Sequence, residues 1–109
     1  MLGFAAIRKD GFPDEQLDRK RWLALIGEFT ELRRVDTLTV GSERYDYSGS
    51  AELLRNGERV GMFIWERGQV CVDGPYSMFT LAQTIAEILD ARVFDVAGDE
   101  MLEVPADDE

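Results

Sequence analysis

Hydrophobic residues recur at the spacing of an α-helix in two segments of the chain. In the first, apolar positions from Leu17 to Phe29 are separated by charged ones, and Pro13 stands where a first helical residue is favoured. In the second, Ser77 provides an N-cap, and the apolar residues from Met78 to Leu89 fall on one side. We therefore expect amphipathic helices over residues 14–29 and 77–90.

Around these helices the pattern is typical of short β-strands, rich in β-branched and aromatic residues. Asn56-Gly57 favours a tight hairpin turn, because both turn positions need positive φ, and Glu66-Arg67-Gly68 predicts a second tight turn. Gly49 predicts a bulge or a turn. The expected strands are residues 2–8, 37–40, 44–47, 51–55, 58–65, 69–72 and 92–96, with a short final strand at 100–104.

With Gly49 as a bulge inside one strand over residues 44–55, the order of these elements is β-α-β-β-β-β-α-β(-β), which predicts an α+β fold. Two helices on one face of an antiparallel meander are the simplest way to bury both apolar stripes. A chain of 109 residues is long enough for one core without disulfides. We expect one domain over residues 1–104 and a disordered acidic tail over residues 105–109.

The charge is strongly negative, with 22 acidic and 12 basic residues and a formal net charge of −10. This charge opposes binding to nucleic acid or to anionic membranes and favours a basic protein partner. The alternative that the acids only keep the protein soluble stays open. We expect a cytoplasmic protein, because no apolar run approaches the ~20 residues of a membrane span, no basic segment opens a signal peptide, and the lone Cys71 suits a reducing compartment.

The sequence has few features typical of an enzyme, because it contains no histidine and no phosphate-binding, metal-binding or nucleophile motif. Cys71 fits a small buried strand residue. The carboxylate clusters around Asp95 and around Asp46 lack the spacing of a calcium-binding loop. We expect no enzyme activity, no cofactor and no metal.

Three segments carry a resemblance to a known class of proteins. They are the helix sequence RWLALI at 21–26 followed by Glu31-Leu32-Arg33, the strand-turn-strand FIWERGQV at 63–70, and the helix-to-strand LAQTIAEILDARV at 81–93, which closes near Gly98-Asp99-Glu100. Together they resemble small bacterial immunity-type proteins encoded beside secreted antibacterial toxins. Asp90 stands where that pattern has a glycine, and the acidic turn near Asp99 is shifted.

The resemblance implies a protein that binds and occludes a cognate effector delivered by type VI, contact-dependent or Rhs-type systems. Charge complementarity with a basic toxin would speed the encounter, and an aromatic anchor among acids would hold the complex. Residues at turns and strand ends form the expected binding set: Tyr45, Asp46, Tyr47, Trp65, Glu66, Asp73, Tyr76, Asp95, Asp99 and Glu100.

Two other functions stay open at this point. One is a small non-catalytic adaptor or accessory subunit of a bacterial assembly, which predicts a large apolar patch. The other is an enzyme that uses carboxylates or a cofactor, which predicts a deep pocket with convergent polar groups and perturbed carboxylates. A homodimer through an exposed strand such as residues 44–47 is a further alternative.

Overall fold

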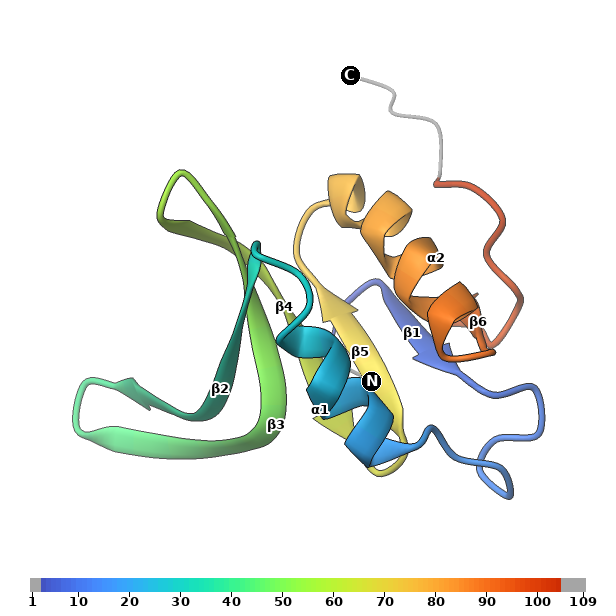
Figure 1. Cartoon of the computed structure of the whole chain (residues 1–109), viewed down its shortest axis with the longest axis horizontal. Helices are drawn as coiled ribbons and strands as arrows, with labels where there is room; N and C mark the ends of the chain where they lie inside the picture. Colours follow the sequence, from blue (N-terminus) through green and yellow to red (C-terminus); the bar gives the residue numbers. More distant parts are fainter. Residues whose placement is uncertain (1–2, 105–109) are drawn as a thin grey trace.

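The computed structural model describes residues 3–104 and shows a six-stranded antiparallel sheet with two α-helices (Figure 1). The strand order is β2-β3-β4-β5-β1-β6. The predicted α+β class and element order are confirmed. In chain order the elements are β1 (Ala5–Arg8), α1 (Arg19–Ile26), β2 (Leu32–Val40), β3 (Glu43–Arg55), β4 (Glu58–Glu66), β5 (Gln69–Asp73), the 3₁₀ turn η1 (Tyr76–Met78), α2 (Phe79–Ile88) and β6 (Arg92–Asp95).

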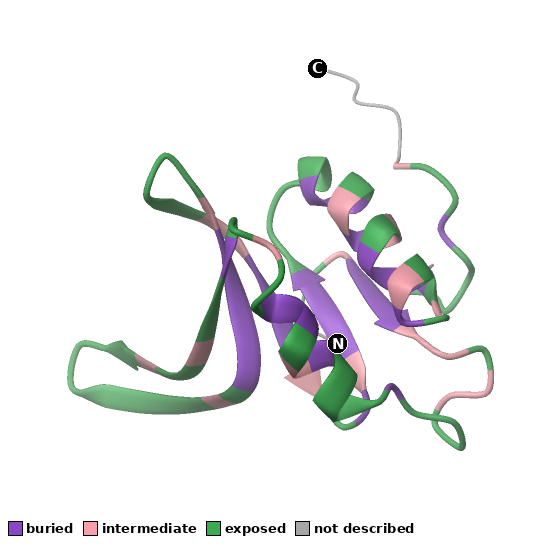
Figure 2. Cartoon of the chain, in the orientation of Figure 1, coloured by how far each residue is buried: buried purple, intermediate pink, exposed green. Residues whose placement is uncertain are grey.

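Both helices pack on the same face of the sheet, where they share one hydrophobic core. Trp22 and Leu25 from α1 and Ile85 from α2 are at most 1% exposed and meet Phe63 and Val72 from the strands. Burying one large side chain contributes about 1.5–3 kcal/mol, so these contacts hold the two layers together. Figure 2 shows the buried residues gathered between the helices and the central strands.

The opposite face of the sheet carries a smaller cluster of buried residues, Met62, Ile64 and Cys71, with Val35 and Tyr47 packed against it. Cys71 lies fully buried in β5, as predicted, and its Sγ donates to Glu66 Oε1 at 3.4 Å. No helix within residues 3–104 covers this side, so side chains from the strands themselves shield it from water.

The two predicted hairpin turns are confirmed. Asn56 and Gly57 have φ of 56° and 80° between paired residues of β3 and β4, and Arg67 and Gly68 have φ of 51° and 92° between β4 and β5. Two consecutive positive φ angles match the right-handed twist of the flanking strands. These turns set the register of the central meander.

The first helix is shorter than the predicted residues 14–29, because the chain caps it at Asp18. The Asp18 carboxylate accepts hydrogen bonds from the backbone N–H of Lys20 at 3.0 Å and of Arg21 at 3.4 Å. The preceding segment is an irregular loop tied to the sheet by the Leu17 N–H, which donates to the Gly68 carbonyl at 2.9 Å. Pro13 therefore does not begin the helix.

The predicted N-cap at Ser77 is also wrong. Ser77 lies inside η1, and α2 follows that turn directly with Met78 at its N-cap position and no side-chain capping bond. A backbone hydrogen bond holds the turn that precedes α2, since the Met78 N–H donates to the Pro75 carbonyl at 3.0 Å.

The strands differ from the prediction in length. The predicted strands 44–47 and 51–55 belong to one long strand, β3, with the Gly49 bulge between them, and the strand expected over 37–40 begins already at Leu32. The final strand over 100–104 is wrong, because only Glu100 forms an isolated bridge, to Phe94. Strand β1 begins at Ala5, and the tail at 105–109 lies outside the described residues.

Candidate functional site

The ten residues of the expected binding set do not form one surface. Tyr45, Asp46 and Tyr47 lie on β3 near one edge of the sheet, whereas Asp95, Asp99 and Glu100 lie on or beyond β6, the strand at the other edge. The others are spread between them, with Trp65 and Glu66 at the end of β4, Asp73 at the end of β5 and Tyr76 in η1. Six of the ten residues therefore belong to two separate regions, one towards each edge of the sheet.

The first region is a two-stranded arm, residues 36–48, that projects away from the helices (Figure 1). Its root is a bulge, because Val35 pairs with Ser50 but Thr37 pairs with Asp46, which leaves Asp36 alone opposite three residues of β3. Strand β4 pairs with β3 only from Ala51 onward. Beyond the bulge, β2 and β3 pair only with each other among the described residues.

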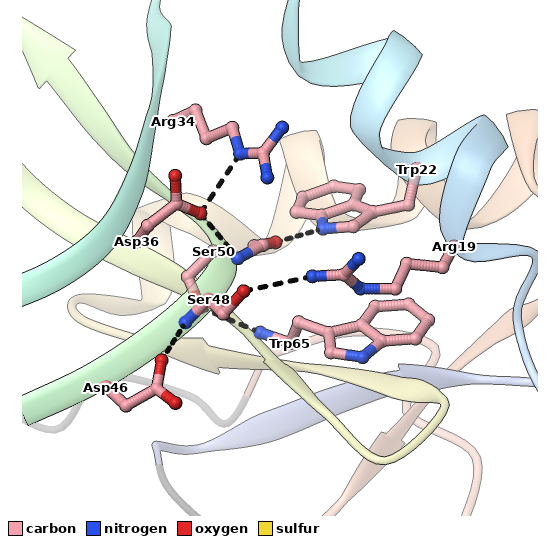
Figure 3. Close-up of polar contacts among 9 residues, drawn as sticks. Arg19, Trp22, Arg34, Asp36, Asp46, Ser48, Ser50 and Trp65 are labelled. Carbon is pink, nitrogen blue, oxygen red and sulfur yellow. Dashed lines mark hydrogen bonds and ion pairs between the residues drawn. The ribbon is translucent and has the colours of Figure 1, made fainter.

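Polar contacts fix the root of the arm (Figure 3). Asp36 Oδ1 accepts hydrogen bonds from the Gly49 N–H at 2.9 Å and from Arg34 Nε at 3.1 Å. These two bonds, the one from the backbone first, hold the pKa of the Asp36 carboxyl below its usual value. Asp46 Oδ1 accepts from the Ser48 N–H at 3.0 Å, so the N–H groups of Ser48 and Gly49 in the bulge both have partners.

Helix α1 braces the same root from the other side. Trp22 Nε1 donates to the Gly49 carbonyl at 2.7 Å, and Arg19 Nη2 donates to Ser48 Oγ at 3.2 Å (Figure 3). The Arg19 guanidinium also stands 5.9 Å from the ring centre of Trp65. Trp65 thus contacts α1 at the root of the arm, and its half-buried ring is already partly covered by Arg19.

Glu66 is likewise engaged within the chain. Its Oε1 accepts hydrogen bonds from Gln69 Nε2 at 3.2 Å and from Cys71 Sγ at 3.4 Å. These contacts give Glu66 a structural role at the β4–β5 turn.

The second region is a groove between β6, η1 and the segment after β6, with a volume of about 520 Å³. We name it the C-terminal groove. Apolar side chains dominate it and acids stand among them. Its lining consists of Phe4, Tyr76, Val96, Ala97, Met101 and Leu102 with the acids Asp95, Glu100 and Glu103.

The backbone of the C-terminal groove is irregular but firmly held. Asp95 Oδ1 accepts from the N–H of Ala97 at 2.9 Å and of Asp99 at 3.0 Å, and the Asp95 N–H donates to the Asp99 carbonyl at 2.8 Å. The Met101 N–H donates to the Val93 carbonyl at 2.8 Å and returns the chain to β6. On the other side, Phe4 and Tyr76 meet edge to face at 5.0 Å.

Large apolar side chains are exposed in this groove. Of the five exposed large hydrophobic residues in residues 3–104, three line it: Tyr76 at 49%, Val96 at 70% and Leu102 at 73% exposure. Single exposed hydrophobic residues are ordinary, but a cluster around a hollow marks an interaction surface.

Acidic groups surround these apolar side chains. Glu100 is paired with Arg92 at 3.0 Å, and Arg92 also reaches Asp10 at 3.4 Å. No ion pair in the described part of the chain involves Asp99 or Glu103. The C-terminal groove is therefore lined by three acids, Asp95, Glu100 and Glu103, and by no basic residue, and we call these acids its acidic rim.

Three members of the expected set line this groove, namely Tyr76, Asp95 and Glu100, and Asp99 lies in the loop that forms it. The sequence did not indicate Phe4, Val96, Met101 or Leu102. They come from both ends of the chain and follow no periodic pattern, so only the pairing of β1 with β6 reveals that they converge. The signal that was present is the run of apolar residues inside an acidic, turn-rich segment.

A second hollow of about 510 Å³ lies against β2 and the β3–β4 hairpin. Its buried acid, Glu52, is 7% exposed and accepts from Arg33 Nε at 2.6 Å. This pair satisfies the carboxylate inside the fold, so the hollow does not present a free reacting group.

No protein-family model, no curated protein and no solved structure matches this chain. Within residues 3–104, no three His, Cys, Asp or Glu side chains gather as a metal site would require. No helix in the same range is both long and apolar enough to cross a membrane.

Proposed function

We propose that this protein is a non-catalytic inhibitor of the immunity type, which binds a basic antibacterial toxin through the C-terminal groove. The observation that carries the proposal is the concentration of exposed Tyr76, Val96 and Leu102 beneath an acidic rim. The resemblance of the helix and hairpin sequences to immunity-type proteins names the class of partner.

The geometry suits recognition of a protein segment. An apolar side chain of the partner entering the groove would cover Val96 and Leu102, and each buried methylene contributes ~0.8 kcal/mol. Lysine or arginine residues beside that anchor would meet Asp99 and Glu103, which have no ion pair among the described residues. The acids would also speed the encounter with a basic partner.

The groove is already shaped in the unbound chain. The hydrogen bonds of Asp95 and Met101 hold the loop, so little backbone ordering remains to oppose binding. The bound protein would inhibit the toxin by blocking the path of its substrate, since a chain of 109 residues is large enough to do so. Its net charge of −10 would favour contact with the basic surface of the toxin.

A small adaptor subunit is the second candidate, because an apolar groove also suits a permanent partner. The acidic rim favours the inhibitor, since permanent interfaces are more apolar and contain fewer charges at their centre.

Co-expression tests the proposed function. The probe is the protein encoded by the gene adjacent to the gene for this chain, expressed in a bacterial host with and without the chain. We expect growth to stop with the probe alone and to recover when the chain is present. A probe that is harmless alone, or that stays toxic beside the chain, contradicts the immunity function.

A pair of matched variants assigns the effect to the groove. Tyr76→Ala in the groove and Tyr45→Ala on the arm remove tyrosines of similar exposure, 49% and 44%. We expect Tyr76→Ala to weaken protection and Tyr45→Ala to preserve it. Equal protection by both variants would show that another surface binds the toxin.

A further inference from the structure

The outer edge of β2 in the arm is an unpaired strand edge. Strand β2 pairs with β3 on one side, and no other strand or loop in residues 3–104 pairs with its other side over residues 37–40. An isolated two-stranded ribbon is only marginally stable in water. A further strand on this edge would stabilise the arm.

The register tells which backbone groups point outward. The turn Gly41-Ser42 joins Val40 to Glu43, and Gly41 has a φ of 63° at the first turn position, as a two-residue hairpin of type II′ requires. In such a hairpin the pair next to the turn is hydrogen-bonded, and pairs alternate beyond it. The N–H and C=O groups of Thr37 and Thr39 therefore face away from β3.

The two edges of the arm differ in the residues that flank the outward backbone groups. On β3 the corresponding residues are Arg44 and Asp46, both charged, and charged edge residues discourage strand addition. On β2 they are Thr37 and Thr39, which are uncharged and exposed. Strand addition is thus favoured at β2 and opposed at residues 44–47, where the sequence pointed to a dimer edge.

The segment on β2 is symmetric about its central residue, because Thr37-Leu38-Thr39 reads the same in both directions. An antiparallel pair of such segments places Leu38 opposite Leu38 of a second copy and Thr37 opposite Thr39. Asp36 then meets Val40, so no like charges stand opposite each other. Threonine pairs and apolar pairs across strands are favourable.

We propose that residues 37–40 of β2 bind the same residues of a second copy of this chain, antiparallel about a two-fold axis at Leu38. The interaction joins two sheets edge to edge. It also extends an apolar stripe, because Tyr45 pairs with Leu38 inside each arm and both lie on one face of the ribbon. Within residues 3–104, the two exposed large hydrophobic residues outside the C-terminal groove are Tyr45 and Val40, and both belong to the arm.

The dimer is weak and responds to salt in a characteristic direction. Each contact involves few residues, so we expect a dissociation constant in the micromolar range or above, as for interfaces below ~1,200 Å². Each copy carries a charge of −10, so raising the ionic strength screens the repulsion and strengthens the dimer. Binding of a basic partner in the C-terminal groove responds in the opposite direction.

Cross-linking by an introduced cysteine tests the register. A central antiparallel pair of this kind is not hydrogen-bonded and brings its Cα atoms to about 4.5 Å, within reach of a disulfide. We expect Leu38→Cys, treated with oxidised glutathione, to form a disulfide-linked dimer. Thr39→Cys is the matched control and stays monomeric, because its neighbour in the second copy is Thr37. Equal cross-linking of both variants, or of neither, overturns the proposal.

Sedimentation equilibrium of the whole chain measures the association itself. We expect the mean mass to rise from one chain towards two between roughly 10 μM and about 1 mM, the range of weak interfaces. Thr39→Pro removes an N–H group that faces away from β3 and makes no hydrogen bond to it. We therefore expect this variant to stay monomeric, with a circular dichroism spectrum like that of the wild type. A wild-type chain that stays monomeric at every concentration and salt level contradicts the dimer; the co-expression result does not depend on it.

Discussion

The arm and the C-terminal groove differ in how regular their backbones are and in which groups they leave exposed. In the arm the backbone is regular, but its outer edges pair with no other strand of residues 3–104, and its aromatic support, Trp22, is buried at the root. In the groove the backbone is irregular, yet Asp95 and Met101 pin it internally, and the apolar side chains Val96 and Leu102 are exposed. The arm therefore offers backbone groups to another strand, and the groove offers side chains to a protein anchor.

The two regions also differ in the electrostatic contribution to binding. The β2 edge of the arm is uncharged over residues 37–40, so the electrostatic repulsion that opposes its pairing comes from the overall charge of the two copies. The groove has an acidic rim, so electrostatic attraction contributes to any basic partner. Variants that perturb each region separately test this difference, and the largest effect is expected at the root of the arm.

The root of the arm is the most sensitive position. We expect Trp22→Ala to lower the free energy of unfolding by about 3–5 kcal/mol, because it empties a fully buried site and removes the bond to the Gly49 carbonyl. Trp22→Phe is the matched control and should lose about 1–2 kcal/mol, chiefly because the hydrogen bond is lost and the Gly49 carbonyl is left unpaired. Urea unfolding measures both; similar losses in the two variants would show that packing at this site matters little.

Glycine at the bulge is the next test. Gly49 has a φ of 81°, and a Cβ there would lie 2.7 Å from Arg19 Nη2, whereas Gly41 has a φ of 63° and open space around it. We expect alanine to cost about 1 kcal/mol at Gly41 from its φ alone. Gly49→Ala should cost more, because the Arg19 side chain must also move from Ser48 and Trp65. Thermal unfolding compares the two, and a smaller loss at Gly49 would contradict the bracing role of Arg19.

The groove should respond in affinity and not in stability. Leu102 is 73% exposed, so Leu102→Asp should change the free energy of unfolding by about 0.5 kcal/mol or less. It should weaken binding of the adjacent gene's product by about tenfold or more, as loss of an interface anchor does. Isothermal titration calorimetry and urea unfolding together separate the two; unchanged affinity would place the partner elsewhere.

Acid should reveal the contribution of Asp36, the smallest of these effects. Because hydrogen bonds lower its pKa in the folded chain, the ionised carboxylate stabilises the fold above its unfolded pKa, near 3.8. That contribution disappears as pH falls through the lower, folded pKa. We expect the difference in Tm between the wild type and Asp36→Asn to be constant near neutral pH and to shrink below pH ~4. A constant difference down to pH ~2 would contradict the hydrogen-bond assignment.

The sequence predicted the local features whose cause is local. Asn56-Gly57 and Arg67-Gly68 specify their turns because the φ requirement belongs to those residues. Gly49 likewise marked the bulge. The helix start at Asp18 was missed because the prediction rested on Pro13. The hydrogen bond of the Leu17 N–H to the carbonyl of Gly68, far along the chain, holds the preceding segment as a loop.

The candidate site was predictable only in part, for a related reason. Tyr76 and the acids near Asp95 were expected to bind a partner, but their apolar neighbours Phe4 and Leu102 lie almost a hundred residues apart in the chain. Sheet order brings these segments together, and no local pattern encodes it. The exposure of Val96 and Leu102 likewise follows from tertiary structure, because the residue type alone does not tell whether a valine or leucine is buried.

The most direct test of the central claim compares the matched tyrosines in dilute solution, with the adjacent gene's product as the probe. We predict that Tyr76→Ala weakens binding about tenfold or more, that Tyr45→Ala changes it less than about twofold, and that wild-type affinity falls as salt is raised. Equal affinities of the two variants, with no dependence on salt, would contradict recognition by the C-terminal groove.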